Sequence, residues 1–419
     1  MKKTKLGEVL DVKRGTSLAG KYYSNTGKYI RLTLGNFNYP NGGFKENTSK
    51  SDIYFTGPVN DEFILKKGDI ITPLTEQVAG LLGETARIPE SDKYIQSGDI
   101  GLIKTFENLD DSYAYYLISS PIVKKQLGAG AQQTKIRHTS PEKIKDCDVW
   151  LPDIIQQRRA GKLLDEINTL INNNFKIIEN ISEIVNSIYS KWFLQYDFPN
   201  EENKSYCSSK GEMAWNEYYK KLIPKNWTEK SIREIENEII TGKTPSTKIS
   251  GNFGGNIPFI TIDDIRQSSF IYETNRTLTK TGADSQSKKY IPENSICVTC
   301  IATVGLVGIT TQLSQTNQQI NSIVCKDKNN LYYLFNAIKD YFKYSSGAKS
   351  GNIFDNMNKD DFSMIKLIYP DNNTLSKYHD LVEPLYENIK NCSKQIIELK
   401  KIRNMLLPLF INGQIKIED

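Results

Sequence analysis

The sequence predicts an α+β protein with two globular domains in tandem repeat, separated by two long helices that form an antiparallel coiled coil. Three observations support this fold class. Similar segments recur at a long, nearly constant offset, and short β-type runs alternate with turn residues within each copy. Each copy also ends in a long stretch whose apolar residues are spaced alternately by three and four. A chain of 419 residues has room for such an arrangement.

The repeat is visible in four pairs of matching segments. The pairs are 29–37 with 257–265, 65–73 with 291–299, 114–130 with 331–347, and the junctions at Pro152 and Pro370. Their offsets are 228 (257 − 29), 226 (291 − 65), 217 (331 − 114) and 218 (370 − 152) residues. A slowly drifting offset indicates the same order of elements with loops of different length. The chain is therefore predicted to contain two copies of one unit rather than a short-period solenoid.

The first part of each copy has the pattern of a globular α+β domain. Runs such as FILKKGDIITPL (63–74) and SICVTCIATVGLVGI (295–309) are rich in β-branched and apolar residues and are bounded by Gly, Asn and Ser. One shorter helical run interrupts these strands in each copy, at 113–127 and at 330–344. Mixed short strands with one helical segment predict an α+β domain in both copies.

The second part of each copy has the pattern of a coiled-coil seam. A spacing of three and four that lasts for four heptads exceeds what one stripe of a globular helix requires. The predicted core residues are Leu164, Ile167, Ile171, Ile178, Ile181, Ile188 and Trp192 in the first helix, and Leu385, Ile389, Ile396, Leu399, Leu406 and Phe410 in the second. Asn174 and Arg403 occupy polar positions of the seam, beside Phe175 and Ile402. Neither helix buries its stripe alone, so we expect the two to pack antiparallel.

These patterns divide the chain into six segments. The predicted segments are a first globular domain at 1–152, a helix at 153–196, a polar surface linker at 197–227, a second globular domain at 228–373, a helix at 374–411 and a tail at 412–419.

Composition and cysteine spacing exclude several classes of function. The chain has 38% hydrophobic residues and no apolar run long enough to cross a membrane, so we expect a cytoplasmic protein without a membrane partner. The net charge of +5 permits nucleic acid as a partner without requiring it. Cys297 and Cys300 form the single CxxC, but the chain has two histidines and lacks a second ligand pair, so we predict no metal site.

Known catalytic patterns are incomplete in this chain. The segment TGKTPS at 241–246 contains the GKT of a phosphate-binding loop, but the first glycine of that motif would fall at Asn237. Neither an Asn-Pro-Pro-aromatic tetrapeptide for amino methylation nor a glycine-rich nucleotide fingerprint occurs. Asp371, Glu398 and Lys400 could form a phosphodiesterase-type set, but the last two flank the predicted seam, where solvated charges are expected. We therefore expect a chain without catalytic activity.

The remaining candidates for function are polar loops at equivalent places in the two copies. The pairs are 11–18 with 239–246, 128–140 with 345–357, and Gln77 with 316–322. Their side chains are of the types that read base edges or bind phosphates. The predicted DNA contacts are Lys13, Arg14, Thr16, Gln77, Gln132, Gln133, Lys135, Arg137 and His138 in the first copy, and Lys243, Thr244, Ser246, Gln318, Gln319, Lys349 and Asn352 in the second.

Two variable domains that alternate with two long helices form a layout that resembles the specificity subunit of Type I restriction–modification systems. LPDIIQQRRAGKLLDEI (151–167) is similar to the start of that family's first conserved helix. GAGAQQTKIRHTSPEKI (128–144) is similar to the closing loop of a target recognition domain, and 198–227 is similar to the central linker. One departure is the start of the chain, which lacks the Ile-Pro-x-x-Trp motif found at 223–227.

The resemblance implies a subunit that reads double-stranded DNA, with one half-site bound by each target recognition domain. Two methyltransferase subunits would bind its helices and supply S-adenosylmethionine. Restriction–translocase subunits that use ATP and Mg would join them for phage defence, so the chain itself needs no cofactor. Two alternatives stay open: a specificity subunit of a related multi-subunit methylation or restriction system, and a coiled-coil protein–protein adaptor.

Overall fold

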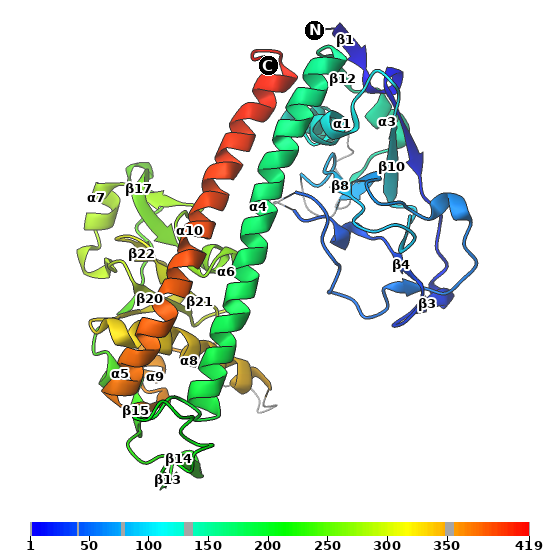
Figure 1. Ribbon diagram of the computed structural model, residues 1–419. Coiled ribbons are helices and arrows are strands. Elements are labelled where there is room, and N and C mark those ends of the chain that lie inside the picture. The colour runs from blue at the N-terminus through cyan, green and yellow to red at the C-terminus, as the bar shows by residue number, and fades with distance from the viewer. Residues whose placement is uncertain (1, 40–41, 77–79, 130–136, 348–355, 419) are drawn as a thin grey trace. The chain divides into compact units, whose positions relative to one another are not determined.

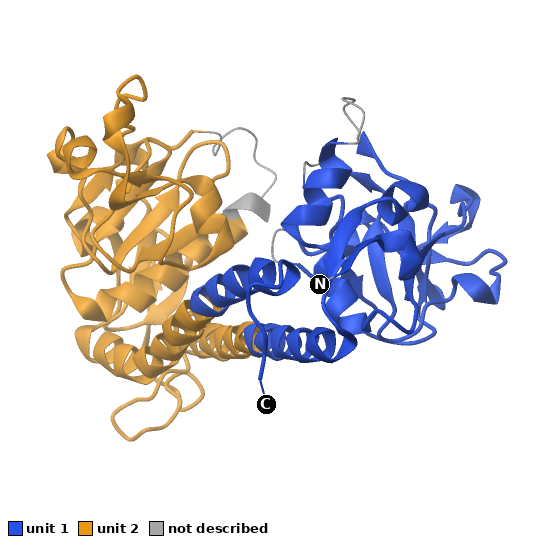
Figure 2. Ribbon diagram, turned by 90° about the horizontal axis from the view of Figure 1, so that it is seen from above, with its two compact units in different colours: residues 1–172, 397–419 blue, residues 173–396 orange. Residues whose placement is uncertain are grey.

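The computed structural model contains two compact units (Figures 1 and 2). Unit 1 comprises residues 1–172 and 397–419, and unit 2 comprises residues 173–396. The structure describes residues 2–39, 42–76, 80–129, 137–347 and 356–418. Each of the two longest helices contributes residues to both units, so the chain passes from one unit to the other within a helix and not in a loop.

Unit 1 is built on a four-stranded antiparallel sheet. Its order is β2 (Leu10–Arg14), β10 (Ile100–Thr105), β6 (Ile70–Pro73) and β8 (Ala86–Arg87). Their β-branched and leucine side chains are buried on both faces of this sheet, in two separate apolar clusters. Strands that are buried on two faces read as nearly continuous apolar runs, which is how 70–74 (IITPL) and 100–103 (IGLI) read in the sequence.

Shorter strands surround this sheet. A second sheet has the order β3 (Tyr23–Ser24), β5 (Tyr54–Phe55), β4 (Tyr29–Arg31) and β9 (Tyr94–Ile95), with β4 and β9 parallel. Two antiparallel pairs complete the unit: β1 (Lys2–Lys5) with β12 (Asp148–Leu151), and β7 (Thr75–Glu76) with β11 (Arg137–His138). The first pair joins the start of the domain to its end. The second pair joins the middle of the domain to its closing loop.

The helical run predicted at 113–127 forms two helices instead of one. They are α1 (Asp111–Ile118) and α2 (Pro121–Ala129), and Pro121 separates them because proline lacks a backbone N–H and is favoured at the start of a helix. Asp110 caps α1 by accepting a hydrogen bond from the backbone N–H of Tyr113 (3.0 Å). The unit's remaining helices are α3 (Pro141–Lys145) and the 3₁₀ turns η1 (Leu6–Glu8), η2 (Gly20–Tyr22), η3 (Leu34–Asn36) and η4 (Asp61–Phe63).

Unit 2 repeats the central sheet and adds one strand to it. The order is β16 (Ile239–Thr241), β23 (Ile320–Val324), β20 (Ser295–Thr299), β21 (Val307–Thr310) and β18 (Phe270–Ile271). The first four strands pair antiparallel in the same order as their counterparts in unit 1. The predicted tandem repeat is thereby confirmed at the level of strand order.

The other elements of unit 2 also follow the order of unit 1. The remaining strands are β17 (Phe253–Ile260) between β19 (Thr277–Leu278) and β22 (Gln315–Thr316), and β15 (Thr228–Ser231) paired with β24 (Lys366–Tyr369). β17 and β22 are parallel, as are β4 and β9 in unit 1. The helices are α5 (Ile232–Ile235), α6 (Ile262–Gln267), α7 (Lys280–Asp284), α8 (Lys328–Gly347) and α9 (Lys359–Ser363), with 3₁₀ turns η6 (Ser250–Asn252) and η7 (Ser287–Lys289).

The two predicted long helices are present as α4 (Ile154–Tyr189) and α10 (Asn372–Ile411), and α4 continues into the π-helical turn η5 (Ser190–Leu194). In unit 1 the first part of α4 packs in one apolar cluster with the last residues of α10, including Phe410. In unit 2 the last part of α4 packs with the first part of α10, and Trp192 lies 5.7 Å from the ring of Tyr378. In both units the start of one helix packs against the end of the other, so the two helices are antiparallel (Figure 1).

Each predicted seam residue is at least half-buried in the described chain. The fully buried ones are Leu164, Ile167, Ile171, Trp192, Ile389, Ile396 and Phe410, and the half-buried ones are Ile178, Ile181, Ile188, Leu385, Leu399 and Leu406. The polar position Asn174 is also buried, whereas its neighbour Phe175 is exposed. No helix among the described residues is long and apolar enough to cross a membrane.

The segment predicted as a surface linker, 197–227, instead contributes to the core of unit 2. It contains a hairpin of β13 (Met213–Asn216) and β14 (Lys221–Pro224). The rings of Phe198 and Trp227 are buried and stack with centroids 4.9 Å apart. Isolated aromatic residues in a polar stretch carry no periodicity, so the sequence pattern did not indicate this packing.

Candidate nucleic-acid interface

The first polar loop of unit 1 follows β2 and is held by the chain between β9 and β10. The backbone N–H of Gly15 donates to Ile100 O (3.1 Å), and the N–H of Thr16 donates to Gln96 O (3.4 Å). The buried Gln96 amide donates to Lys13 O (2.7 Å) and to Ile100 O (2.9 Å). These bonds fix the backbone while the side chains of Lys13 and Arg14 stay exposed.

The last part of the predicted closing loop of the same unit contains β11, which is held by a buried carboxylate. Glu76 is 2% exposed and lies 3.5 Å from Arg137 Nη1. The same carboxylate accepts hydrogen bonds from the N–H groups of Gly80 and Leu82, at 3.0 Å each. His138 pairs with Thr75 in the strand, and its side chain is exposed. A buried anion with several donors is a stable anchor for a loop.

The first loop and β11 lie at the same end of the strands of the central sheet, and this end is called the loop edge below. Thr16 forms a parallel bridge with Ser97, and Arg14 Nε donates to Gly98 O (2.9 Å). On the other side of that segment, the N–H of Leu74 donates to Asp99 O, and the N–H of Thr139 donates to Leu74 O, both at 2.8 Å. The segment 96–99 therefore connects both predicted loops.

Unit 2 has the same arrangement with different side chains. The N–H of Gly242 donates to Ile320 O (3.1 Å), and the N–H of Lys243 donates to Thr316 O (2.9 Å). The hydroxyl of Thr244 donates to Gln318 Oε1 (2.8 Å), so two predicted loops touch directly. The third loop joins them through β20, because the N–H of Cys300 donates to Gln319 O and the N–H of Met357 donates to Cys300 O, both at 2.8 Å.

Strand order changes one of the predicted loop equivalences. The sequence pairs Gln77 with 316–322, but in the structure 316–319 follows β22 and precedes β23, as 96–99 follows β9 and precedes β10. The pairing of β7 with β11 corresponds to the isolated bridge between Ile301 and Asn356 in unit 2, and Gln77 itself lies outside the described residues. The strands involved are two residues long, which is too short to show a period in the sequence.

The predicted contact residues thus have three outcomes. Those at the loop edge of unit 1 are Lys13, Arg14, Thr16, Arg137 and His138, and those at the equivalent edge of unit 2 are Lys243, Thr244, Gln318 and Gln319. Ser246 lies farther along, where its carbonyl accepts a hydrogen bond from the Asn252 amide (3.0 Å). Gln77, Gln132, Gln133, Lys135, Lys349 and Asn352 lie outside the described residues.

Sequence reasoning missed the residues that hold these loops. Gln96 and Glu76 are buried polar side chains whose partners lie far away in the chain, and the same is true of the backbone of Cys300. Gln96, Glu76 and the backbone of Cys300 each bind a loop through a hydrogen bond or ion pair, and the pairing of strands brings the two partners together. A glutamine within YIQSGD has no distinguishing sequence signal, so the fold was needed to find it.

The candidate catalytic and metal patterns have structural roles. Lys243 and Thr244 of the GKT segment are engaged in loop contacts, and Asp371 accepts hydrogen bonds from the N–H and hydroxyl of Thr374 at the start of α10. Burial raises the pKa of the Cys297 thiol to about 12 and that of Cys300 to about 11, so both stay neutral. Within the described residues, no group of three or more His, Cys, Asp or Glu is placed to hold a metal ion.

Comparison with known families and proteins gives consistent matches. The model of the family described as Type I restriction modification DNA specificity domain matches residues 1–187 and 224–401. The HindI specificity subunit of Haemophilus influenzae is 39% identical over 196 residues, which are 46% of this chain and 42% of that subunit. The MjaIX specificity subunit of Methanocaldococcus jannaschii is 24% identical over 73% of this chain and 69% of its own length.

A solved structure has the same fold at low sequence identity. It is the crystal structure of a Type-I restriction-modification system S subunit from M. genitalium, with a TM-score of 0.58 and 14% identity. The match covers 98% of this chain and 96% of that one. At this identity the likeness supports the two-unit fold and its long helices.

Proposed function

Because the chain belongs to the family of Type I restriction modification DNA specificity domains, we propose that it reads a two-part target in double-stranded DNA. One half-site would be bound by the first recognition domain (1–152) and the other by the second (228–373). In such a system the chain is the specificity subunit, and the chemistry belongs to its partners. The match to the Haemophilus subunit spans less than half of that protein. The target, the partners and the activity of the whole assembly are therefore part of this proposal.

The observation that carries this proposal is the repeated loop edge. Both units hold exposed polar loops at the same end of the same sheet order, anchored by equivalent backbone bonds. The anchored backbone is alike in the two units, but the exposed side chains differ, with Lys13 and Arg14 in one and Lys243 and Gln318 in the other. Equivalent scaffolds with different side chains are suited to reading different bases.

The side chains have different expected roles. Exposed Lys and Arg near a backbone of fixed geometry would position the domain through phosphates, which carry no sequence information. Gln, Asn and Thr side chains would read base edges, together with arginine where it reaches guanine. We assign base reading to Thr16, Arg137, Thr244, Gln318 and Gln319, and to the predicted residues Gln77, Gln132, Gln133 and Asn352 outside the described part. The predicted residues Lys135 and Lys349, also outside it, are assigned to phosphates.

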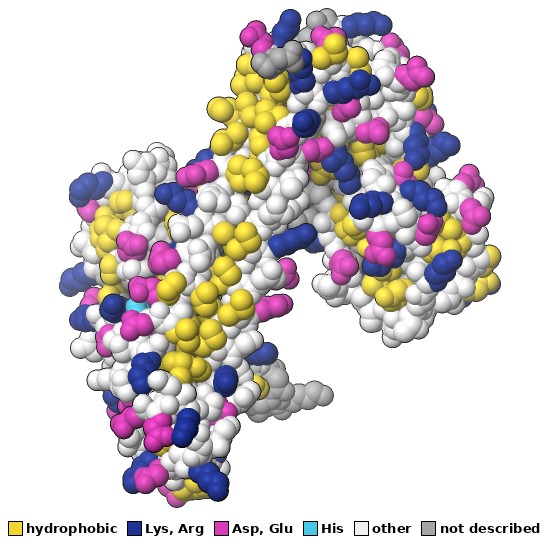
Figure 3. Space-filling model, in the orientation of Figure 1, with side chains coloured by type: hydrophobic (Ala, Val, Ile, Leu, Met, Phe, Trp, Pro, Cys, Tyr) yellow, Lys and Arg dark blue, Asp and Glu magenta, His cyan; other side chains and the backbone are white. Residues whose placement is uncertain are grey.

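The long helices supply a surface for the partner subunits. Leu170, Ile177 and Ile184 on α4 are each about half exposed and are spaced by seven residues, which places them on one side of the helix. Figure 3 shows exposed hydrophobic side chains over the long helices. We propose that this stripe binds helices of two methyltransferase subunits, which carry S-adenosylmethionine. Restriction–translocase subunits with ATP and Mg would join that complex.

The test is methylation by a reconstituted complex. The chain is purified alone and with methyltransferase subunits of a Type I system, each is given DNA and S-adenosylmethionine, and the methylated bases are mapped by sequencing. We expect methylation only in the complex, at a motif of two short half-sites separated by a gap of fixed length. Methylation by the isolated chain, or a motif without a gap, would contradict the proposal.

A binding measurement separates this function from that of a protein–protein adaptor. Binding of the complex to target DNA should weaken steeply as salt rises, because each phosphate contact releases counterions. An adaptor without DNA binding would show no such dependence.

A further inference from the structure

The first recognition domain contacts α4 along a row of mainly polar residues. Gln157, Gly161, Asp165 and Asn168 are spaced by four, four and three residues, so they lie on one face of the helix. The backbone of α1 approaches this face closely, because a Cβ added to Gly161 would lie 2.9 Å from Tyr113 N. The buried Gln157 accepts a hydrogen bond from the N–H of Asp110 (3.0 Å).

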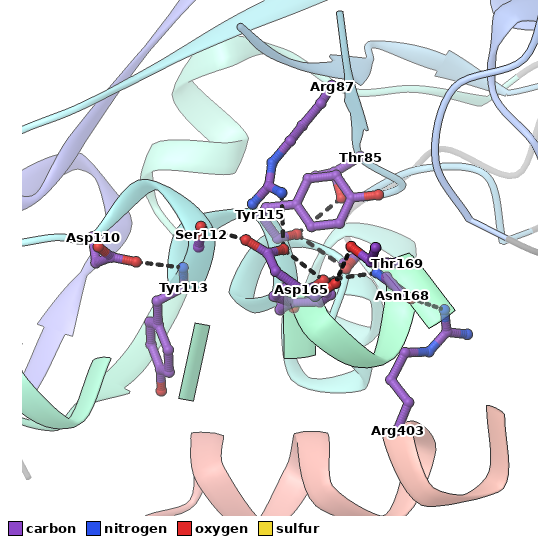
Figure 4. A network of polar contacts seen from close by, with 12 residues as sticks. Thr85, Arg87, Asp110, Ser112, Tyr113, Tyr115, Asp165, Asn168, Thr169 and Arg403 are labelled. Carbon is purple, nitrogen blue, oxygen red and sulfur yellow. Dashed lines mark hydrogen bonds and ion pairs between the residues drawn. The ribbon is translucent and has the colours of Figure 1, made fainter. Parts of the chain in front are cut away.

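Asp165 is the centre of this contact (Figure 4). Its carboxylate accepts hydrogen bonds from Arg87 Nη1 (2.8 Å) and the Tyr116 hydroxyl (2.8 Å) on one oxygen. The Ser112 hydroxyl donates to the other oxygen (2.6 Å). Arg87 comes from β8, whereas Ser112 and Tyr116 come from α1. One carboxylate of the helix therefore binds two separate elements of the domain.

The same network extends to α10. The Asn168 amide donates to the Tyr116 hydroxyl (2.7 Å), and Arg403 Nη1 donates to Asn168 Oδ1 (2.8 Å). Arg403 is the polar position of the predicted seam, and this bond gives it a partner inside unit 1. A chain of hydrogen bonds thus joins the domain, α4 and α10.

Partial burial makes this network stronger than a surface ion pair. The side chains of Arg87 and Asp165 are 33% and 28% exposed, and the guanidinium lies 4.6 Å from the ring centre of Tyr115. Burial lowers the pKa of Arg87, but the hydrogen bond and charge of Asp165 raise it, and the net shift is upward. Burial, followed by the Asp165 charge, raises the pKa of Tyr116. Both groups therefore remain hydrogen-bond donors near neutral pH.

The equivalent contact in unit 2 has a different chemistry. The positions 218 residues later on α10 are Leu375, His379, Glu383 and Tyr386. The ring of Tyr332, from α8, stacks on Tyr386 with centroids 4.1 Å apart and on His379 at 5.4 Å. Glu383, which corresponds to Asp165, lies 3.4 Å from His379 of its own helix. Stacked rings hold the second domain where a carboxylate holds the first.

We propose that Asp165 is a positioning residue that fixes the orientation of the first recognition domain on the long helices, and thereby the length of the gap between the half-sites. This inference rests on the proposed function. Successive base pairs differ by about 3.4 Å along the DNA axis and about 34° around it. A domain that reads one half-site must therefore be held within that tolerance, and directional hydrogen bonds to one charge provide such a constraint.

The experiment replaces Asp165 by asparagine in the complete methyltransferase complex. A library of targets with gaps one base pair shorter and longer than the natural one is methylated and sequenced. We expect D165N to lower methylation at the natural gap by roughly tenfold relative to the neighbouring gaps. The preferred bases of both half-sites should stay unchanged, whereas a general folding defect would lower all targets together. An unchanged gap profile would overturn the inference.

The matched control is Glu383→Gln, which removes the equivalent carboxylate in unit 2. It should leave the gap profile as in the wild type, because ring stacking carries that contact. A gap profile relaxed as much by E383Q as by D165N would count against a special role for Asp165.

A second measurement uses the purified chain and does not depend on the proposed function. Amide hydrogen exchange of α1 should be faster in D165N than in the wild type and unchanged in E383Q, because only the first variant loses contacts of α1. If wild-type complexes fail to methylate a two-part target, the proposed function fails, but this measurement still decides whether Asp165 holds the domain. Equal exchange of α1 in D165N and wild type would refute the positioning role.

Discussion

At the scale of single residues, Gly15 and Gly242 show how the proposed DNA-reading loops are built. A Cβ on Gly15 would lie 2.3 Å from Ser97 O, and one on Gly242 would lie 2.2 Å from Asn317 O. Only glycine allows the loop after the first strand of each central sheet to approach the neighbouring backbone so closely. Both residues therefore fix the backbone next to the exposed side chains of Lys13 and Lys243.

Replacing either glycine by alanine should damage one half of the recognition. The added methyl group forces the loop away from its partner, and we expect Gly15→Ala and Gly242→Ala each to cost about 1–3 kcal/mol of unfolding free energy. Methylome sequencing should show weaker selection in the first half-site for the former and in the second for the latter. Gly251→Ala is the control, because a Cβ there meets nothing within 4 Å. Equal effects of all three variants would contradict this account.

At the scale of elements, adjacent residues of α4 have opposite environments. Val185 is 2% exposed within the apolar cluster that joins α4, α8 and α10, whereas Ile184 is 50% exposed. The polar seam residue Arg403 also faces the other helix, because it donates a hydrogen bond to Asn168 of α4. The seam therefore stabilises the chain, whereas the stripe of Leu170, Ile177 and Ile184 is exposed.

The two faces can be separated by one pair of variants. Val185→Asp should destabilise the chain by more than about 4 kcal/mol, because it buries an unpaired charge. Ile184→Asp should change the unfolding free energy by less than about 0.5 kcal/mol, as expected for an exposed position. Chemical denaturation measures both, and co-purification measures the binding of methyltransferase subunits. Ile184→Asp should weaken that binding, and normal binding would exclude the stripe as the docking surface.

At the scale of the whole molecule, the repeat predicts modular specificity. Each loop edge is built from one recognition domain alone, so each should read its half-site independently. Exchanging residues 228–373 for the equivalent domain of a relative should change one half of the methylated motif. The other half and the gap should stay the same, since the first domain and the Asp165 network are untouched. Methylome sequencing of the chimera tests this, and a change in both halves would refute modular reading.

The sequence alone determined the repeat, the two long helices and most of their buried faces. Those features depend on local periodicity, which four heptads express clearly, so the spacing by itself assigns Leu164 and Ile389 to the seam. The repeat also places the polar loops 11–18 and 239–246 at equivalent positions of the two copies.

Only the tertiary structure decided which residues hold those loops and the domains. Gln96 bonds Lys13 across 83 residues, and Glu76 meets Arg137 through a pair of two-residue strands. Phe198 enters the core from a stretch that reads as a linker, and Asp165 meets Arg87 across 78 residues. Such contacts join short segments that are distant in the chain, and segments of two residues are too short to show a period. Their partners are set by strand pairing and helix packing, which the order of residues along the chain does not display.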